Sequence, residues 1–375
     1  MLIGIETSAA SLENAGDTTY MRELLAGLAR VDARNYYRLI AIRPHPFYAQ
    51  LSDRFVFRHL SRPWSLLRYF TSLPWELRRH PVDVVHVQYI LPTGFSGRSV
   101  VTIHDLHFEH YPRHYPPVDR MFLKYFVRRS TRQADQIVTD SEHSKRDLQA
   151  RYGVAEEKIR VIPLGINPRF RPEPDPARLR AVREKYGVAD RFILFIGRIV
   201  DQRKNASLLM DAFVALGREA ACGHQLVIAG KNEGRGPAAL MAKARTLGEG
   251  RIHFPGFIAE ADVPALMSAA SVFVYPSLFE GFGLPPLEAM ACGTPVVSSN
   301  VTSLPEVVGE AALLVNPHDR DELVEALRRL LADTDLRQHL REEGFQRAAK
   351  YVWDHCARQT LAVYEDVYRM TSKTS

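Results

Sequence analysis

Short apolar runs alternate with segments of helical periodicity along nearly the whole chain. Strands that are buried on both faces read as continuous apolar runs, and a strand–helix–strand order places such strands parallel to one another. The pattern therefore predicts an α/β architecture in which helices cover both faces of parallel sheets. The runs that we interpret as strands are LIGIE (2–6), RLIAI (38–42), VDVVHVQYI (82–90), SVVTIHDL (99–106), DQIVTDS (135–141), IRVIPLGI (159–166), RFILFIG (191–197), QLVIAGK (225–231), RIHFPGF (251–257) and VFVYPS (272–277).

A proline-rich segment, PLGINPRFRPEPDP at residues 163–176, interrupts this alternation. Such composition is typical of a linker between domains. A chain of 375 residues is too long for one small core and fits two domains of ordinary size. We therefore expect two α/β domains that meet at residues 165 and 166.

The composition indicates a globular protein of a reducing compartment. Its 46% hydrophobic and 25% charged residues are ordinary values for a folded domain. Cys222, Cys292 and Cys356 are scattered and odd in number, which argues against a disulfide framework or a cysteine zinc site. The N-terminus enters a strand without a basic leader, and no run of about 18 apolar residues follows. We expect a cytoplasmic protein without a membrane span.

The net positive charge comes from the first part of the chain. Residues 1–165 contain 23 Lys and Arg against 17 Asp and Glu, which accounts for the whole net charge of +6. Basic and aromatic side chains interleave in residues 58–79 and 113–132. Such a face suits the anionic headgroups of a membrane's inner surface, and an ordinary solvated surface fits it as well. Nucleic acid is not an expected partner, because no recognition motif accompanies the charge.

The stretch EGFGLPPLEAMACGTPVV, residues 280–297, combines a glycine loop with a short helix. It follows an apolar run, and its two prolines suit a first helical turn. The amides of Gly281–Leu284 would point out of the helix N-terminus, where an anion is favoured. Glu280 before the loop and Glu288 in the first helical turn place carboxylates for hydroxyl groups. The alternative is an ordinary turn, with Glu288 present because it suits the helix dipole.

This stretch, with its two glutamates, resembles the signature of the retaining glycosyltransferases of family 4. The resemblance covers nearly the whole chain and is strongest over residues 192–316. It implies the GT-B fold, with two Rossmann-like β/α/β domains facing a central cleft and a C-terminal helix that crosses back to the first domain. The acceptor-binding domain would be residues 1–165 with the returning helix 356–375, and the nucleotide-sugar-binding domain residues 166–355.

The resemblance also implies which residues contact the donor. Arg198 and Lys204 would bind the diphosphate, for which a guanidinium offers a fork and an ammonium a mobile charge. Glu288 would accept hydrogen bonds from the ribose hydroxyl groups. The implied nucleotide-sugar-binding residues are Gly16, Arg198, Lys204, Lys231, Phe257, Ile258, Glu280, Gly281, Phe282, Gly283, Leu284 and Glu288.

The implied catalytic residues are His104, Glu280, Arg198 and Lys204. His104 follows a predicted strand and would face the transferred sugar, whose hydroxyl groups Glu280 would orient. The cations would receive the negative charge of the leaving diphosphate, so that neither a metal nor a cofactor is expected. No carboxylate pair matches that of the retaining glycosidases. We therefore expect same-face attack, in which the departing phosphate oxygen deprotonates the acceptor hydroxyl.

Other motifs have competing interpretations. His104, His107, His110 and His114 are spaced like metal ligands, but their proline-rich loop does not favour the convergent geometry that zinc needs. Two D-x-D runs, at 319–321 and 333–335, read as helix caps. Ser141 and Ser144 fit helix caps and ligands equally well.

The expected reaction moves a sugar from a nucleotide diphosphate-sugar to a hydroxyl group of a glycan or lipid-linked acceptor. The runs TIHDL and SKRDL resemble those of bacterial mannosyltransferases of surface-polysaccharide synthesis, so GDP-mannose is the first donor expected and a UDP-sugar the second. Rival interpretations are a sugar-nucleotide epimerase of the same fold and a non-catalytic binding partner in a glycan assembly. The interpretation as a non-catalytic binding partner rests on one departure from the family's pattern. The family's first loop carries a glycine pair or a G-x-G-R run, where this chain has only Gly16 followed by Asp17.

Overall fold

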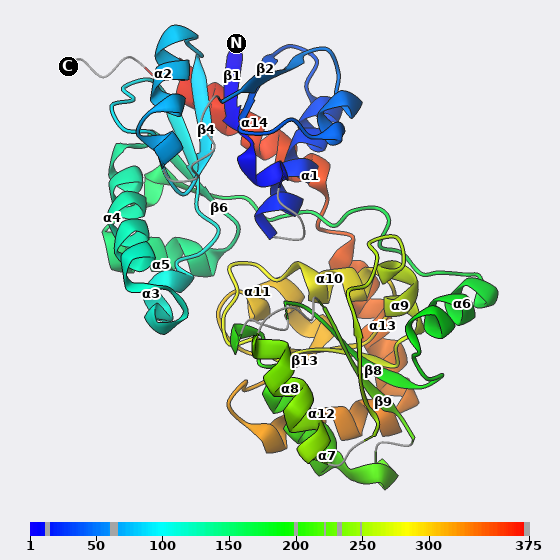
Figure 1. Ribbon diagram of the computed structural model, residues 1–375. Helices are drawn as coiled ribbons and strands as arrows, with labels where there is room; N and C mark the ends of the chain where they lie inside the picture. Colours follow the sequence, from blue (N-terminus) through cyan, green and yellow to red (C-terminus); the bar gives the residue numbers. More distant parts are fainter. Residues whose placement is uncertain are drawn as a thin grey trace. The chain divides into compact units, whose positions relative to one another are not determined.

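The computed structural model describes residues 1–11, 16–60, 67–198, 202–220, 223–230, 235–247 and 250–370. Its contacts divide the chain into two units, one formed by Met1–Gly165 with Val352–Ser375 and the other by Ile166–Tyr351. Figure 1 shows the chain leaving the first unit in green and re-entering it in red. The return comes at Val352, earlier than the expected residue 356.

A seven-stranded parallel sheet forms the centre of the first unit, as far as the structure describes it. Its strand order is β3-β2-β1-β4-β5-β6-β7, so the chain changes direction across the sheet between β1 and β4. Loops that leave the carboxyl ends of strands at such a point diverge and leave room for a ligand. The strands are β1 (Leu2–Glu6), β2 (Tyr36–Ala41), β3 (Phe55–His59), β4 (Val84–Gln88), β5 (Ser99–Thr102), β6 (Gln136–Thr139) and β7 (Ile159–Val161).

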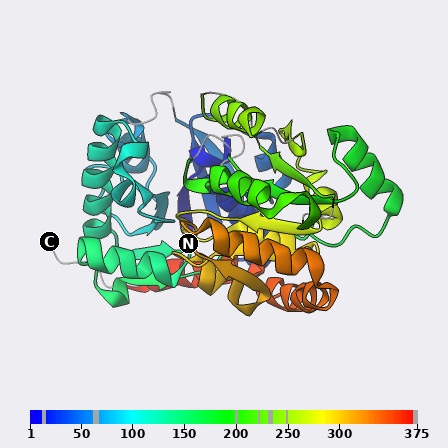
Figure 2. The same ribbon diagram turned by 90° about the horizontal axis from the view of Figure 1, so that it is seen from below.

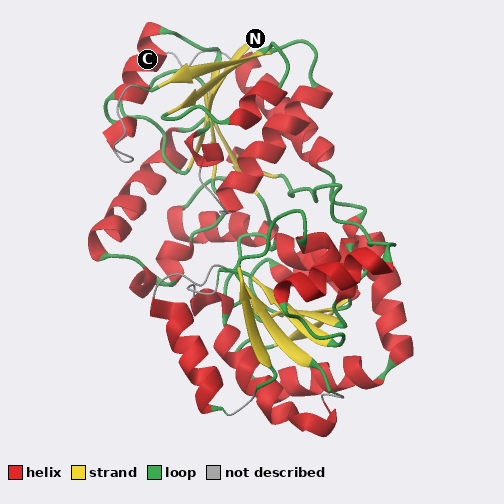
Figure 3. Ribbon diagram, turned by 45° about the vertical axis from the view of Figure 1, so that its right-hand side comes forward, coloured by secondary structure: helices red, strands yellow, loops and turns green. Residues whose placement is uncertain are grey.

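Helices cover both faces of this sheet (Figure 3). The α-helices are α1 (Gly16–Val31), α2 (Ser72–Arg79), α3 (His107–His110), α4 (Pro117–Gln133), α5 (Glu142–Tyr152) and α14 (Trp353–Arg369). The 3₁₀ turns are Ser8–Ser11, Pro46–Gln50, Leu67–Tyr69, Pro112–His114 and Glu156–Lys158.

Helix α14 completes the first unit although it comes from the end of the chain. It packs mainly against α1 and also against β4, β5 and β6. A Cβ atom at Gly165 would lie 2.1 Å from the backbone nitrogen of Trp353, so the chain can pass the start of α14 only with glycine at this position. This close approach explains why the return begins before residue 356.

The second unit contains, in its described residues, a six-stranded parallel sheet with the order β10-β9-β8-β11-β12-β13. The chain changes direction between β8 and β11, which are neighbours. The central strands β8 and β11 are buried at every residue except Ile196 at the end of β8, which is the expected property of a sheet covered on both faces. The strands are β8 (Phe192–Ile196), β9 (Gln225–Ala229), β10 (Ile252–Gly256), β11 (Val272–Tyr275), β12 (Val296–Ser299) and β13 (Ala312–Val315).

The helices of the second unit lie on both sides of its sheet, and Figure 2 shows them from below. The α-helices are α6 (Pro176–Tyr186), α7 (Ala206–Ala220), α8 (Arg235–Thr246), α9 (Val263–Ala269), α10 (Leu284–Ala291), α11 (Leu304–Val308), α12 (Arg320–Ala332) and α13 (Thr334–Ala348), with 3₁₀ turns at Gln202–Lys204 and Gly309–Ala311. Within the described residues, no helix of either unit has both the length and the apolar character needed to cross a bilayer.

Candidate functional site

Two of the predicted donor-site residues of the second unit, Arg198 and Glu280, lie where its strand order reverses. Arg198 follows the carboxyl end of β8, and Glu280 follows the carboxyl end of β11. These two strands are hydrogen-bonded neighbours, so the loops that carry both residues leave the same edge of the sheet. Ligands of doubly wound sheets bind at this kind of position.

Lys204 and Glu280 form a buried ion pair at this edge. The Lys204 Nζ lies 2.5 Å from Glu280 Oε1, and the two residues are 8% and 7% exposed. Lys204 Nζ also donates to the hydroxyl of Tyr275 and lies 4.9 Å from the centre of that ring. Ser277 Oγ donates to the same carboxylate oxygen at 2.6 Å. The sequence did not identify Tyr275 or Ser277 as partners, although both stand in the VFVYPS run just before Glu280.

The surroundings of Glu280 keep it ionised. Burial by itself would raise the pKa of this carboxyl group, but the cations of Lys204 and Arg203 and the hydrogen bonds from Lys204 and Ser277 lower it below its ordinary value. Glu280 is therefore a carboxylate with one oxygen already engaged, and it holds the Lys204 ammonium in a fixed place.

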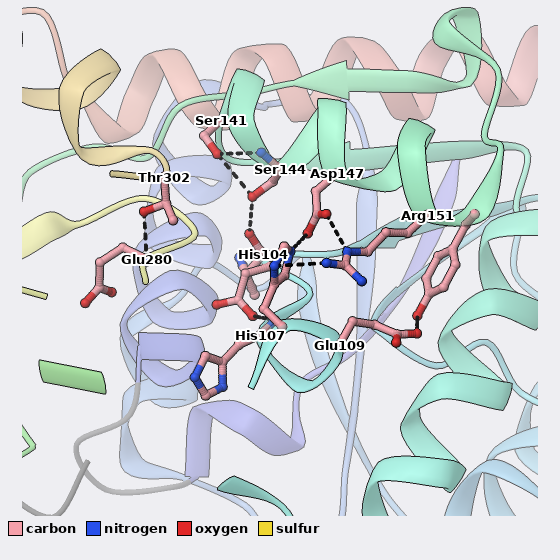
Figure 4. Close-up of polar contacts among 12 residues, drawn as sticks. His104, His107, Glu109, Ser141, Ser144, Asp147, Arg151, Glu280 and Thr302 are labelled. Carbon is pink, nitrogen blue, oxygen red and sulfur yellow. Dashed lines mark hydrogen bonds and ion pairs between the residues drawn. The ribbon is translucent and has the colours of Figure 1, made fainter. Parts of the chain in front are cut away.

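Two residues after β12 hold the backbone on either side of Glu280. The Glu280 amide donates to Thr302 Oγ1 at 3.1 Å (Figure 4). Ser303 Oγ lies 2.9 Å from the carbonyl oxygens of both Glu280 and Phe282. Thr302 has a φ of 57°, in a region that a threonine rarely adopts. Sequence reasoning missed both residues, and no motif at Thr302 and Ser303 could have shown this long-range contact.

The glycine loop leads directly into α10, as predicted. Gly283 caps this helix with a φ of 105°, and both prolines lie in its first positions. A Cβ atom at Gly283 would lie 2.5 Å from Leu304 Cδ2, so both the conformation and the space require glycine. Glu288 is half-buried and lies after the first turn of α10, which contains no acidic residue. The expectation that placed Glu288 in the first turn was wrong because the helix begins as early as Leu284.

The remaining predicted donor-site residues differ in how far they are exposed. Arg198 and Phe257 are exposed, whereas Ile258 is buried. The Phe282 ring packs edge-on against Tyr351 with centroids 5.7 Å apart, so only its backbone could contact a ligand at the loop. Lys231 lies outside the described residues. Gly281 is buried in the loop, and Leu284 is half-buried at the start of α10.

His104 occupies the corresponding edge of the first sheet. Its Nδ1 lies 2.7 Å from Asp140 Oδ2, and its Nε2 lies 3.2 Å from Gln88 Oε1. Burial by itself would lower the pKa of His104, but the Asp140 carboxylate raises it to about 9. Both ring nitrogens therefore face oxygen acceptors, which suits a protonated imidazolium. Gln88 is the last residue of β4 and Asp140 comes directly after β6, and sequence reasoning did not identify either of them.

The elements around His104 also fix its backbone and its ring. Ser144 Oγ donates to the His104 carbonyl at 2.8 Å, and Ser141 Oγ caps α5 by accepting from the Ser144 amide (Figure 4). Tyr20 of α1 packs edge-on against the imidazole ring, with centroids 4.6 Å apart. Gly16, the predicted loop residue, is exposed at the start of the same helix. The two serines therefore act as a cap and a backbone anchor.

The other histidines of this segment point to different partners. His107 Nδ1 lies 3.1 Å from the Tyr115 hydroxyl, and His110 Nε2 lies 2.7 Å from Asp147 Oδ2. In the part of the chain that the structure describes, no three His, Cys, Asp or Glu side chains converge as metal ligands would. Asp319 caps α12 and Asp333 caps α13, which confirms the interpretation of the two D-x-D runs as helix starts.

Comparisons with known proteins cover both units. Residues 190–333 match the family described as "Glycosyl transferases group 1", and residues 16–170 match "Glycosyltransferase Family 4". O-antigen chain mannosyltransferase B of Escherichia coli is 33% identical over 78% of this chain and 76% of its own length. A D-inositol 3-phosphate glycosyltransferase of Jonesia denitrificans is 30% identical over 97% of this chain and 95% of its own.

Solved structures show the same fold at lower sequence identity. Sucrose-phosphate synthase from Thermosynechococcus elongatus matches with a TM-score of 0.80 and 22% identity, over 98% of this chain and 99% of its own. WaaG, described as a glycosyltransferase of lipopolysaccharide biosynthesis, matches with a TM-score of 0.75 and 19% identity, over 97% and 99% of the two chains. Both likenesses extend over the two doubly wound units and the returning helix.

Proposed function

This chain belongs to glycosyltransferase family 4 and has the GT-B fold, and from this premise we propose that it transfers mannose from GDP-mannose to a hydroxyl group of a glycan or lipid-linked acceptor, with retention of configuration. The observation that carries the proposal is the buried Lys204–Glu280 pair beside the exposed Arg198 at the strand-order reversal of the second unit.

The chemical problem is the charge of the leaving group. Breaking the bond between sugar and phosphate places negative charge on a diphosphate, and groups already in position for that charge stabilise the transition state most. Lys204 is held by Glu280 and Tyr275, so its ammonium needs little rearrangement. Arg198 adds a second cation at the same edge, and the start of α10 adds the dipole of a helix. We assign these three groups to the diphosphate.

A same-face attack, which retains the configuration of the sugar, fits the hydrogen bonds that the Glu280 carboxylate already accepts. Its Oε1 accepts from both Lys204 and Ser277, and such an oxygen is a weak nucleophile. We therefore assign Glu280 to orienting the hydroxyl groups of the transferred sugar, and Glu288 to the ribose. Proton transfer from the acceptor hydroxyl would then go to the departing phosphate oxygen. Because cations of the protein receive the charge, the reaction would need neither a metal nor a cofactor.

The chemistry of the site and the descriptions of the relatives support the proposed donor and acceptor. Several relatives are described as mannosyltransferases, among them one of Escherichia coli and an α-(1→4)-mannosyltransferase of Mycolicibacterium hassiacum. The exposed Phe257 ring after β10 offers a stacking surface for the nucleotide base. His104, as an imidazolium, would donate to an oxygen of the transferred sugar after exchanging one of its present acceptors. We also place the enzyme at the inner face of a membrane, where lipid-linked acceptors are found.

The test is transfer of radiolabelled mannose from GDP-mannose to a lipid-linked acceptor, with UDP-glucose as the competing donor. NMR of the product gives the anomeric configuration, and a parallel reaction in EDTA tests independence from metals. Arg198→Gln should abolish most of the turnover, whereas Arg191→Gln, an exposed arginine at the opposite end of β8, should leave it intact. Nucleotide binding without turnover would favour the non-catalytic partner, and an inverted product would refute retention.

A further inference from the structure

Helix α4 of the first unit carries large apolar side chains on its exposed surface. Val118, Met121 and Tyr125 are 71%, 68% and 64% exposed. Apolar side chains exposed together on one helix mark an interaction surface rather than ordinary surface variation. Figures 1 and 2 both show α4 at the outer margin of its unit.

The two sides of α4 are clearly divided. At about 100° per residue, Phe122, Phe126 and Val127 fall on one side of the helix, and they pack against the core of the first unit. The opposite side, which we call the α4 face, consists of Val118, Met121, Lys124, Tyr125, Arg128 and Arg132, all of them exposed. Three cations and three apolar side chains therefore share one face.

The α4 face borders a groove of about 640 Å³. Four cationic side chains line this groove, namely Lys124, Arg128, Arg129 and Arg132, together with Met121 and Tyr125, and no carboxylate lines it. The one acidic residue of α4 is Asp119, in the first helical turn. Lys124 is paired with Glu109 of α3, but Arg128 and Arg132 have no ion-pair partner among the residues that the structure describes.

We propose that the α4 face docks on the surface of an anionic phospholipid bilayer. Lipid phosphates occupy the cationic groove, and Val118, Met121 and Tyr125 insert among the headgroups. An interfacial helix binds in this way, through apolar area buried at the boundary together with attraction to anionic lipids. A bilayer is favoured over a protein partner because cations and apolar side chains alternate along the helix, and the groove beside them is lined by four cations and no carboxylate. The proposal does not depend on the identity of the donor sugar.

The test is co-sedimentation of the full chain with vesicles of phosphatidylcholine alone or with about 30% phosphatidylglycerol, at low and high salt. Binding should require the anionic lipid and weaken in salt, because surface charges are screened. Each cation near an anionic surface contributes about 1 kcal/mol, so Arg128→Gln with Arg132→Gln should lower the partition coefficient about 30-fold. Met121→Ser with Tyr125→Ser should weaken the binding that remains at high salt.

The matched control is Arg180→Gln with Arg328→Gln, which removes the same charge from exposed positions on α6 and α12 of the second unit. This pair should bind vesicles like the parent protein, and circular dichroism should show that all variants are folded. The proposal is overturned if the parent does not bind vesicles, if both lipid compositions bind it equally, or if the control loses as much affinity as the α4 variants. Vesicle binding needs no turnover, so its failure would remove the support for the membrane placement in the proposed function and would leave the proposed transferase reaction untouched.

Discussion

The Lys204 ammonium and the Glu280 carboxylate lie 2.5 Å apart in a site where both side chains are withdrawn from water. Each one is the main compensation for the buried charge of the other. A buried pair of this kind adds little to stability over an apolar pair, but loss of one partner leaves an uncompensated charge. Stability and ligand binding therefore depend on Lys204 in different ways, and variants can separate the two.

The variant Lys204→Met should destabilise the second unit by about 3 kcal/mol, because Glu280 remains buried without its partner. Adding Glu280→Gln should restore most of that loss, since the remaining groups are neutral. Neither variant should recover full affinity for GDP or transferase activity, because one of the two cations assigned to the diphosphate is absent. Urea denaturation and calorimetric titration with GDP measure the two effects. If the double variant regained affinity for GDP, the assignment of Lys204 to the diphosphate would be wrong.

Gly283→Ala tests the loop that leads into α10. The new Cβ atom would meet Leu304 at 2.5 Å on a backbone with a φ of 105°. The loop must shift, so affinity for GDP should fall at least about tenfold if its amides move out of line by more than a fraction of an ångström. Gly153→Ala is the control, because Gly153 also has a positive φ of 65° but nothing lies near its Cβ position. It should cost about 1 kcal/mol in stability and leave GDP binding unchanged.

The central strands and the boundary between the units could be predicted from the sequence because each depends on local composition. Strands buried on both faces read as apolar runs, and the proline-rich segment stands out by its content. The strand β3 was missed because its apolar run, FVF, is only three residues long, and the strand lies at the sheet edge with most of its side chains partly or fully exposed. Helix α4 was noticed only as a basic and aromatic segment.

The candidate site was predictable where one motif carries it and not where distant segments meet. Glu280 and the glycine loop stand in one stretch, and the family resemblance added Lys204. The hydrogen bonds that hold Glu280 come from Thr302 and Ser303, which belong to a loop after another strand. The same holds for His104, whose partners Gln88 and Asp140 lie at the carboxyl ends of β4 and β6, the two strands that flank β5. Such contacts depend on strand order, which apolar patterns do not specify.

The first unit should become less stable in alkaline solution, where His104 loses its proton. Its pKa of about 9 in the folded state exceeds the ordinary value of about 6.5. The contribution is complete below pH 6.5 and is lost as the pH rises through 9, at up to about 1.4 kcal/mol for each pH unit. His104→Gln should remove this dependence. NMR of labelled histidine gives the midpoint directly, and a midpoint near 6.5 would contradict the role of Asp140.

The return helix α14 is tied to the first sheet by a buried hydrogen bond between Tyr364 and His86. The Tyr364 hydroxyl lies 2.6 Å from His86 Nδ1, and His86 Nε2 lies 2.7 Å from Thr102 Oγ1. Burial lowers the pKa of His86 to about 3, so the ring is neutral and one nitrogen needs a donor. Tyr364→Phe leaves Nδ1 of His86 buried without a partner, which should cost about 1–3 kcal/mol.

Tyr368→Phe is the matched control for that variant, because Tyr368 lies one turn further along α14 and is exposed. Amide hydrogen exchange should show faster opening of α14 in Tyr364→Phe and parent-like exchange in Tyr368→Phe. Since His86 takes up a proton only when it leaves its buried position, the first unit should lose stability as the pH falls from about 6.5 toward 3. Equal exchange in the two variants would mean that apolar packing alone holds the helix, with Gly27 and Gly165 allowing its close approach.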